Sequence, residues 1–208
     1  MRHTFPLLFM ENAFPARENI FIVPPLVSKP TAETDATSRR LTDILCTRCG
    51  LCCDGSLFAD VELAGPRETS GLELLGLDVE DADKGEGALL SLPCRALNGK
   101  RCSIYPHRPE CCRTFECRLL QQAKTGDISV DRAKEKIAEA LKRIERVEQL
   151  LVHWPQGNDR LPLKERCLEA LAVSAESKGD QKINQKRTEL EIAMASLDNF
   201  IQKTFLGG

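Results

Sequence analysis

The sequence predicts an α+β protein, in which a small, loop-rich cysteine-cluster domain with a few short strands and a helix precedes C-terminal helices. Nine of the ten cysteines fall between residues 46 and 117. Short alternating segments and turn signals in that region indicate strands. Beyond residue 126, apolar residues recur at the period of an α-helix, which indicates helices with one buried face.

Three ranges differ in composition, and we expect them to be distinct parts of the chain. Residues 1–40 form an N-terminal arm, apolar and Pro-punctuated to residue 27, and a polar linker over 28–40. Residues 41–125 form the cysteine-cluster metal-binding domain. Residues 126–208 form a helical region, whose helices we expect to pack on the metal domain or on each other.

Alternation and turn residues give the elements of the cysteine region. Asn98-Gly99 is a hairpin signal between two candidate strands. Pro109 suits a first helical turn, and Gly126 suits a helix end. The expected elements are strands at 57–63, 88–97 and 101–105, a loop or variable insertion at 64–88, and a helix from Pro109 to about Lys124.

The C-terminal helices are predicted from their apolar stripes. The first stripe, over 131–153, consists of Ile137, Leu141, Ile144, Val147 and Leu151. Residues 154–158 break this helix with Pro and Gly. A shorter helix is expected at 163–177. The last stripe, over 183–205, consists of Leu190, Met194, Leu197, Ile201 and Phe205. We interpret both stripes as core packing rather than as partner-binding grooves.

Charge and hydropathy exclude several classes of function. The net charge is -2 and the pI is about 6.0, which argue against a general nucleic-acid or membrane-surface binder. No stretch approaches the ~20 apolar residues that span a bilayer. The apolar piece from Phe5 to Met10 is too short for a secretory signal and contains Pro6. We therefore expect a cytoplasmic protein.

Clustered cysteines in a cytoplasmic chain are typical of a metal site rather than of disulfides. Cys46-x-x-Cys49-Gly50 lets two sulfurs meet one metal, and the glycine lets backbone N–H groups point at the sulfurs. Cys52 and Cys53 are adjacent and should point apart, so one of them serves another metal, a disulfide or a buried thiol. A buried thiolate cluster needs compensating charge. Six arginines near the cysteines supply this charge or are ordinary surface residues: Arg48, Arg95, Arg101, Arg108, Arg113 and Arg118.

The later cysteines pose a question of spacing. Cys112 and Cys117 are five residues apart, which is about 500° of helix rotation, so one continuous helix would not bring them together. A break after Cys112 would do so. His107 lies within the block and is expected to be a surface turn residue rather than a ligand. Cys111 and Cys167 are expected to be buried small hydrophobic residues.

The cysteine pattern resembles that of the YkgJ-type cysteine-cluster family, which is described as a zinc- or iron-chelating domain with a CxxCxxCC signature. Its pattern is CxxCGxCC, a separated Cys, then CxIYxxRPxxCRxFxC. The matching stretches are residues 46–53, Cys94 and residues 102–117. The resemblance maps the family cysteines onto Cys46, Cys49, Cys52, Cys53, Cys94, Cys102, Cys112 and Cys117, which are the predicted metal ligands.

The predicted function is metal binding through these thiolates, in a structural, redox or metal-delivery role with a protein client as a further partner. All-thiolate sites suit zinc and iron–sulfur clusters alike. CxxCxxC with a remote cysteine favours [4Fe–4S]. The alternative is a protein lysine N-methyltransferase, because flagellin lysine N-methylases share the cysteine pattern. The sequence has no Gly-rich nucleotide loop and supports no assignment of catalytic residues.

Overall fold

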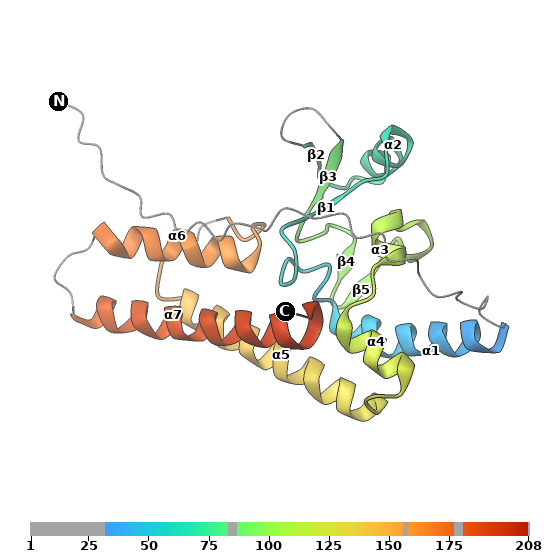
Figure 1. Ribbon diagram of the computed structural model, residues 1–208. Coiled ribbons are helices and arrows are strands. Elements are labelled where there is room, and N and C mark those ends of the chain that lie inside the picture. Colours follow the sequence, from blue (N-terminus) through green and yellow to red (C-terminus); the bar gives the residue numbers. More distant parts are fainter. Residues whose placement is uncertain (1–31, 83–86, 156–157, 177–180, 208) are drawn as a thin grey trace, which may run out of the picture.

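The computed structural model describes residues 32–82, 87–155, 158–176 and 181–207, so the predicted arm at residues 1–27 lies outside the described residues. The α+β prediction is confirmed (Figure 1). The elements in chain order are α1 (Ala32–Cys49), β1 (Asp60–Glu62), α2 (Pro66–Leu74), β2 (Val79–Asp81), β3 (Ala88–Ser91), β4 (Leu97–Asn98), β5 (Arg101–Cys102), α3 (Glu110–Thr114), α4 (Arg118–Thr125), α5 (Val130–Leu151), α6 (Leu163–Glu176) and α7 (Gln181–Ile201). A short 3₁₀ turn spans Tyr105–His107, and a π-helical turn follows α7 over Gln202–Leu206.

A three-stranded antiparallel sheet and helix α2 form the smaller part of the fold. The strand order is β1-β3-β2, and Val61 and Val79 lie opposite Leu90 on either side of the central strand. The sheet and α2 share a small core of buried residues. These residues are Leu63, Leu72, Leu77, Ala88, Leu90 and Ala96, and we call them the sheet core.

The predicted hairpin is confirmed next to this sheet. Strands β4 and β5 pair antiparallel, with Leu97 opposite Cys102 and Asn98 opposite Arg101. Gly99 has φ +61°, a left-handed conformation that a two-residue hairpin turn requires. The predicted strand over 88–97 divides into β3 and β4, because Pro93 lies between them and has no N–H to donate to a ladder.

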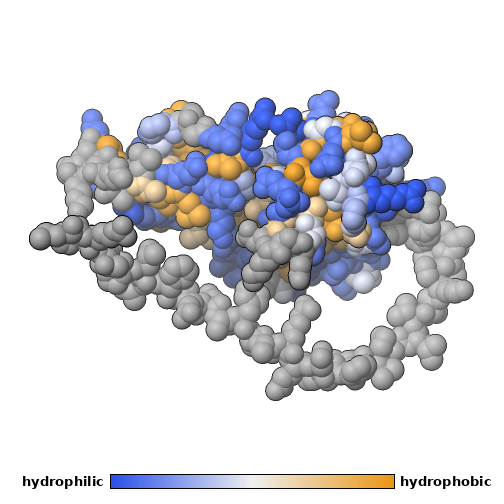
Figure 2. Space-filling model, turned by 90° about the horizontal axis from the view of Figure 1, so that it is seen from above, coloured by the Kyte–Doolittle hydropathy of each residue, from blue (hydrophilic) through white to orange (hydrophobic). Residues whose placement is uncertain are grey.

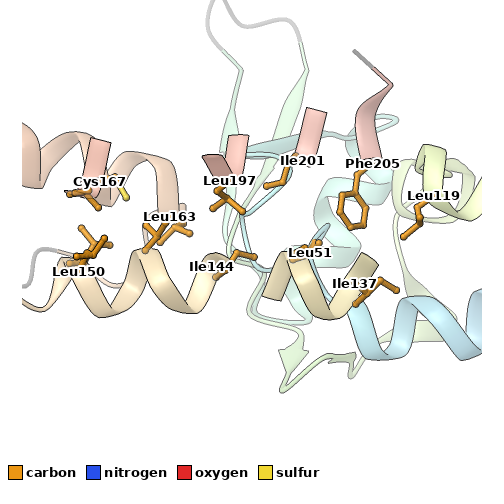
Figure 3. Packing of buried hydrophobic residues seen from close by; sticks show 14 of the residues in the cluster. Leu51, Leu119, Ile137, Ile144, Leu150, Leu163, Cys167, Leu197, Ile201 and Phe205 are labelled. Carbon is orange, nitrogen blue, oxygen red and sulfur yellow. The ribbon is translucent and has the colours of Figure 1, made fainter. Parts of the chain in front are cut away.

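The helices bury their predicted stripes in a larger core. Ser129 caps α5 by accepting a hydrogen bond from the Arg132 N–H at 3.2 Å. The α5 stripe faces the α7 stripe, which confirms core packing rather than a partner groove. Figure 3 shows Ile137 and Ile144 of α5 with Leu197 and Phe205, together with Leu51 and Leu119 from the cysteine region. We call this cluster the helical core.

The helical core crosses the predicted boundary at residue 125. Leu45 of α1 and Leu119 and Leu120 of α4 are buried with residues of α5, α6 and α7. In Figure 1 the sheet and α2 lie above the layer of long helices. Figure 2 shows apolar patches scattered among hydrophilic side chains on one face. No helix in the described part of the chain is long and apolar enough to cross a membrane.

Other expected elements were also wrong in part. The strand over 101–105 ends at Cys102, and a 3₁₀ turn begins at Tyr105. The linker over 28–40 is helical from Ala32, because beyond Pro30 it has no Gly or Pro and is rich in helix formers. The loop over 64–88 contains α2 and β2, since Pro66 starts a helix and Leu72 and Leu77 are buried. The single helix from Pro109 to Lys124 is two helices.

Candidate metal centre

The first predicted ligands lie at the end of helix α1. Cys46 and Cys49 occupy its last turn, where residues three apart share a face. Gly50 then adopts φ +75° and ends the helix, and its N–H donates to the Cys46 carbonyl at 3.3 Å. Burial raises the pKa of Cys49 to about 12, and a hydrogen bond from the Leu51 N–H opposes that rise. The expected effect of the glycine on the backbone is thus confirmed.

A turn carries Cys52 and Cys53 away from the helix. The N–H groups of Cys53 and Asp54 donate to the Gly50 carbonyl at 2.9 and 3.0 Å. Leu51, which is 0% exposed, anchors this turn in the helical core. The turn therefore holds the two adjacent cysteines between the helical core and the sheet core.

Cys117 comes beside α1 because the chain breaks between α3 and α4. Phe115 is extended and packs edge-on against Phe58, with ring centroids 5.1 Å apart. Cys117 then caps the N-terminus of α4, which packs against α1. The predicted single helix is thus broken after Cys112, but the break directs Cys117 toward α1, and no interaction between Cys112 and Cys117 is seen among the described residues. Cys46, Cys49, Cys52 and Cys117 thus lie where α1 meets α4, and we call them the first thiol group.

The remaining four predicted ligands surround the β4–β5 hairpin. The Cys94 N–H donates to the Cys53 carbonyl at 2.8 Å, and the Leu97 N–H donates to the Cys94 carbonyl at 2.9 Å. Leu97 is the strand partner of Cys102. Cys112 lies on α3, close enough to act on Cys53 and Cys94 electrostatically. We call Cys53, Cys94, Cys102 and Cys112 the second thiol group.

Electrostatic effects within the first thiol group follow this arrangement. Burial and, to a smaller extent, the charge of Cys117 raise the pKa of Cys46 to about 11. Burial also raises the pKa of Cys52, with Cys49 and Cys117 next in effect. Burial raises the pKa of Cys117, while N–H groups of Leu119 and Leu120 at the start of α4 oppose it. If these thiols lose their protons, their negative charges repel one another unless a cation binds between them.

Cys53 and Cys94 of the second thiol group behave in the same way. Burial and then the charges of Cys94 and Cys102 raise the pKa of Cys53 to about 12. Burial raises the pKa of Cys94, and the Ala96 N–H opposes the rise by donating to its sulfur. Cys52 and Cys53 therefore respond mainly to different cysteines, as their adjacency in the sequence predicted.

Arg108 is the arginine that acts on these thiols. Its guanidinium lowers the pKa of Cys46 and Cys53 against the larger effect of burial. It stacks 3.6 Å from the ring centroid of Tyr105 and donates to the Tyr105 and Cys112 carbonyls at 3.1 and 3.5 Å. The other five arginines are exposed. Arg108 is thus supported as a residue that compensates thiolate charge, whereas the other five arginines are surface residues.

The sequence indicated N–H donors only for the turn after Cys49. The donors to Cys94 and Cys117 and the Tyr105–Arg108 stack were not predicted. The spacing Tyr-x-x-Arg carried a signal for the stack, because residues three apart meet in a tight helical turn. The N–H donors left no sequence signal, since every residue except proline has one.

Three residues that were not predicted to be ligands, Cys167, Cys111 and His107, lie in different environments. Cys167 is 1% exposed in the helical core, which confirms a buried hydrophobic role. Cys111 is half-buried rather than buried, and a hydrogen bond with Cys112 lowers its pKa to about 7 while raising that of Cys112. His107 is exposed in the 3₁₀ turn, as expected of a surface residue.

The donor chemistry fits zinc or an iron–sulfur cluster. Soft thiolates are preferred ligands of both, and N–H donors to sulfur are characteristic supports. Within the ranges of the chain described above, no three Cys, His, Asp or Glu side chains stand close enough together to hold an ion as placed. The structure thus gives the two neighbourhoods of the thiols, and the ligand set stays a prediction.

A family model described as "CxxCxxCC: Putative zinc- or iron-chelating domain" matches residues 45–146. Over this range the chain is similar to the CxxCxxCC family. The matched range contains all eight predicted ligands and most of α5. Searches of curated proteins and of solved structures found no match.

Proposed function

We propose that this protein binds iron, as a [4Fe–4S] cluster, or zinc, through the thiolates of the two thiol groups. One observation carries the proposal. Parts of the chain that are distant in sequence contribute family-pattern cysteines to neighbouring parts of the fold. Cys46, Cys49 and Cys117 pack against the helical core, and Cys94 and Cys102 pack against the sheet core. The Cys94 N–H donates to the Cys53 carbonyl at 2.8 Å, which links the turn after α1 to the hairpin side.

The electrostatics favour a bound cation. Burial raises the pKa of most of these thiols well above neutrality, and neighbouring cysteines raise several of them further. A metal ion that replaces the thiol protons supplies the missing positive charge. Four thiolates on Zn²⁺ or on an oxidised [4Fe–4S] core leave a charge of about -2. Arg108 and the N–H donors to sulfur offset part of that charge.

The first thiol group favours the iron–sulfur alternative. Cys46, Cys49 and Cys52 repeat at a spacing of three residues, and the remote Cys117 completes the set. CxxCxxC with a remote fourth cysteine is typical of [4Fe–4S] proteins. Zinc remains the alternative that a metal assay separates from iron.

A structural role follows from the position of the first thiol group. A metal there would join the end of α1 to the start of α4, and both helices contribute residues to the helical core. Closing the loop between Cys52 and Cys117 would also restrict the unfolded chain. No observation favours the lysine methylase alternative, and we do not develop it.

The test is purification of the full chain without oxygen, followed by a visible spectrum and assays of iron, sulfide and zinc. We expect bound metal in a fixed ratio to protein. Broad visible absorption with equal iron and sulfide identifies a cluster, and colourless protein with zinc identifies a zinc site. Metal-free protein that gains neither metal on reconstitution would contradict the proposal.

A further inference from the structure

We propose that the two thiol groups are two separate centres, each with four thiolates: one formed by Cys46, Cys49, Cys52 and Cys117, the other by Cys53, Cys94, Cys102 and Cys112. This inference rests on the proposed function and adds the number of centres and the division of the ligands between them. The chain would therefore carry two metal ions or clusters.

Packing separates the two groups. Cys46, Cys49 and Cys117 pack against the helical core, whereas Cys94 and Cys102 pack against the sheet core. The two cores share no residue. The three thiols on the helical core and the two on the sheet core thus lie against different bodies of apolar side chains.

The backbone assigns the two adjacent cysteines to opposite sides of that boundary. The Cys53 carbonyl accepts from the Cys94 N–H at 2.8 Å, which ties Cys53 to the hairpin of the sheet side. Cys52 follows Leu51, which is fully buried in the helical core. Neighbouring residues in an extended or turning chain direct their side chains apart. Cys52 and Cys53 thus divide the CxxCxxCC run.

The usual coordination number of these metals also indicates two centres. Zinc takes four ligands in structural sites, and a [4Fe–4S] cluster takes one cysteine for each iron. Eight thiols therefore satisfy two such centres completely. The proposed division uses all eight, with one member of the Cys52–Cys53 pair in each set.

The number of centres can be measured on the unmodified full chain. We would record native mass spectra of protein prepared without oxygen, together with iron, sulfide and zinc assays. Two centres in each chain are expected. A single centre in fully loaded protein would overturn the division and leave the proposed function standing. Protein that binds no metal would overturn both.

Adjacent variants test the division of the ligands. Cys52→Ser and Cys53→Ser alter neighbouring residues, and mass spectrometry after brief alkylation reports which cysteines each change releases. Cys52→Ser should raise labelling of Cys46, Cys49 and Cys117 several-fold and leave the second thiol group protected. Cys53→Ser should release Cys94, Cys102 and Cys112 and leave the first group protected.

Two results of this experiment would contradict the division of the ligands between two centres. Equal release of both groups by either variant would show one shared centre, and release of the same cysteines by both variants would show that the pair is not divided. Cys167→Ala is the control, because Cys167 lies in the helical core among apolar side chains, and it should leave both groups protected. The native mass of the unmodified chain decides the count even if a variant does not fold.

Discussion

At the scale of single residues, Arg108 has the central position. It stacks on Tyr105, donates to two carbonyls and acts on cysteines of both thiol groups. Arginine suits this place because its planar guanidinium can stack and donate several hydrogen bonds at once. The positive charge of a guanidinium opposes the negative charge of the thiolates.

Replacing Arg108 should therefore weaken metal binding. We expect Arg108→Ala to reduce metal affinity by about 10- to 100-fold, the usual effect of removing a group that supports metal ligands. Competition with a chromophoric chelator measures this change. Arg101→Ala, which alters an exposed arginine on the hairpin, should bind as tightly as the unmodified protein. Equal affinity of both variants would exclude this role for Arg108.

At the scale of elements, the end of helix α1 determines how the first cysteines are presented. Gly50 has φ +75°, and a Cβ atom there would lie 2.9 Å from Cδ of Lys100. The left-handed conformation is the more serious obstacle, because the lysine side chain can move whereas the backbone angle is needed to turn the chain toward Cys52. The glycine after CxxC is thus a requirement of the turn.

The Gly50→Ala variant should lose about 1–2 kcal/mol of unfolding free energy through this backbone strain. Urea unfolding measures the loss. The control is Gly71→Ala in α2, where nothing lies within 4 Å of the added Cβ and φ is not left-handed. That change should be neutral or stabilise by up to about 1 kcal/mol. A Gly50→Ala protein as stable as the control would refute the strain.

Element by element, the sequence analysis succeeded where a signal was local. Apolar stripes predicted α5 and α7, and Asn98-Gly99 predicted the β4–β5 hairpin. Helix α1 was missed because its first half is polar, and because Leu45 is the one buried residue over positions 40–49, the part of the helix whose burial is described. Adjacency predicted that Cys52 and Cys53 diverge. Their partners could not be predicted, because tertiary packing brings Cys94 beside Cys53.

At the scale of the whole molecule, two cores of unequal size support the thiol groups. The helical core unites α1 and α4 with α5, α6 and α7, and so places the first thiol group on the most extensive packed part of the fold. The second group depends on the smaller sheet core. Damage to the helical core should thus reduce the stability of the entire described chain.

Leu190 tests this expectation because it is 0% exposed in α7. Leu190→Ala should lower the unfolding free energy by about 2–5 kcal/mol, the range for a large cavity in a packed core. Ile192→Ala in the same helix is the matched control, since Ile192 is 65% exposed, and it should change stability by less than about 0.5 kcal/mol. Similar losses in both variants, measured by urea unfolding, would contradict the assigned packing.

Metal removal should loosen one region selectively. If a centre joins α1 to α4, a strong chelator should accelerate amide hydrogen exchange at the end of α1 and the start of α4. The middle of α5 and α7 should stay protected, because their contacts are apolar. Hydrogen-exchange mass spectrometry compares the loaded and chelated protein. Uniform acceleration over all helices, or none, would contradict a local structural role.

The central claim is that cysteine thiolates bind the metal, and X-ray absorption at the iron or zinc edge tests it most directly. The measurement reports the type, number and distance of the atoms bound to the metal in the full chain. We predict a shell of four sulfur atoms for each metal ion at about 2.3 Å. A shell dominated by nitrogen or oxygen atoms would contradict the claim.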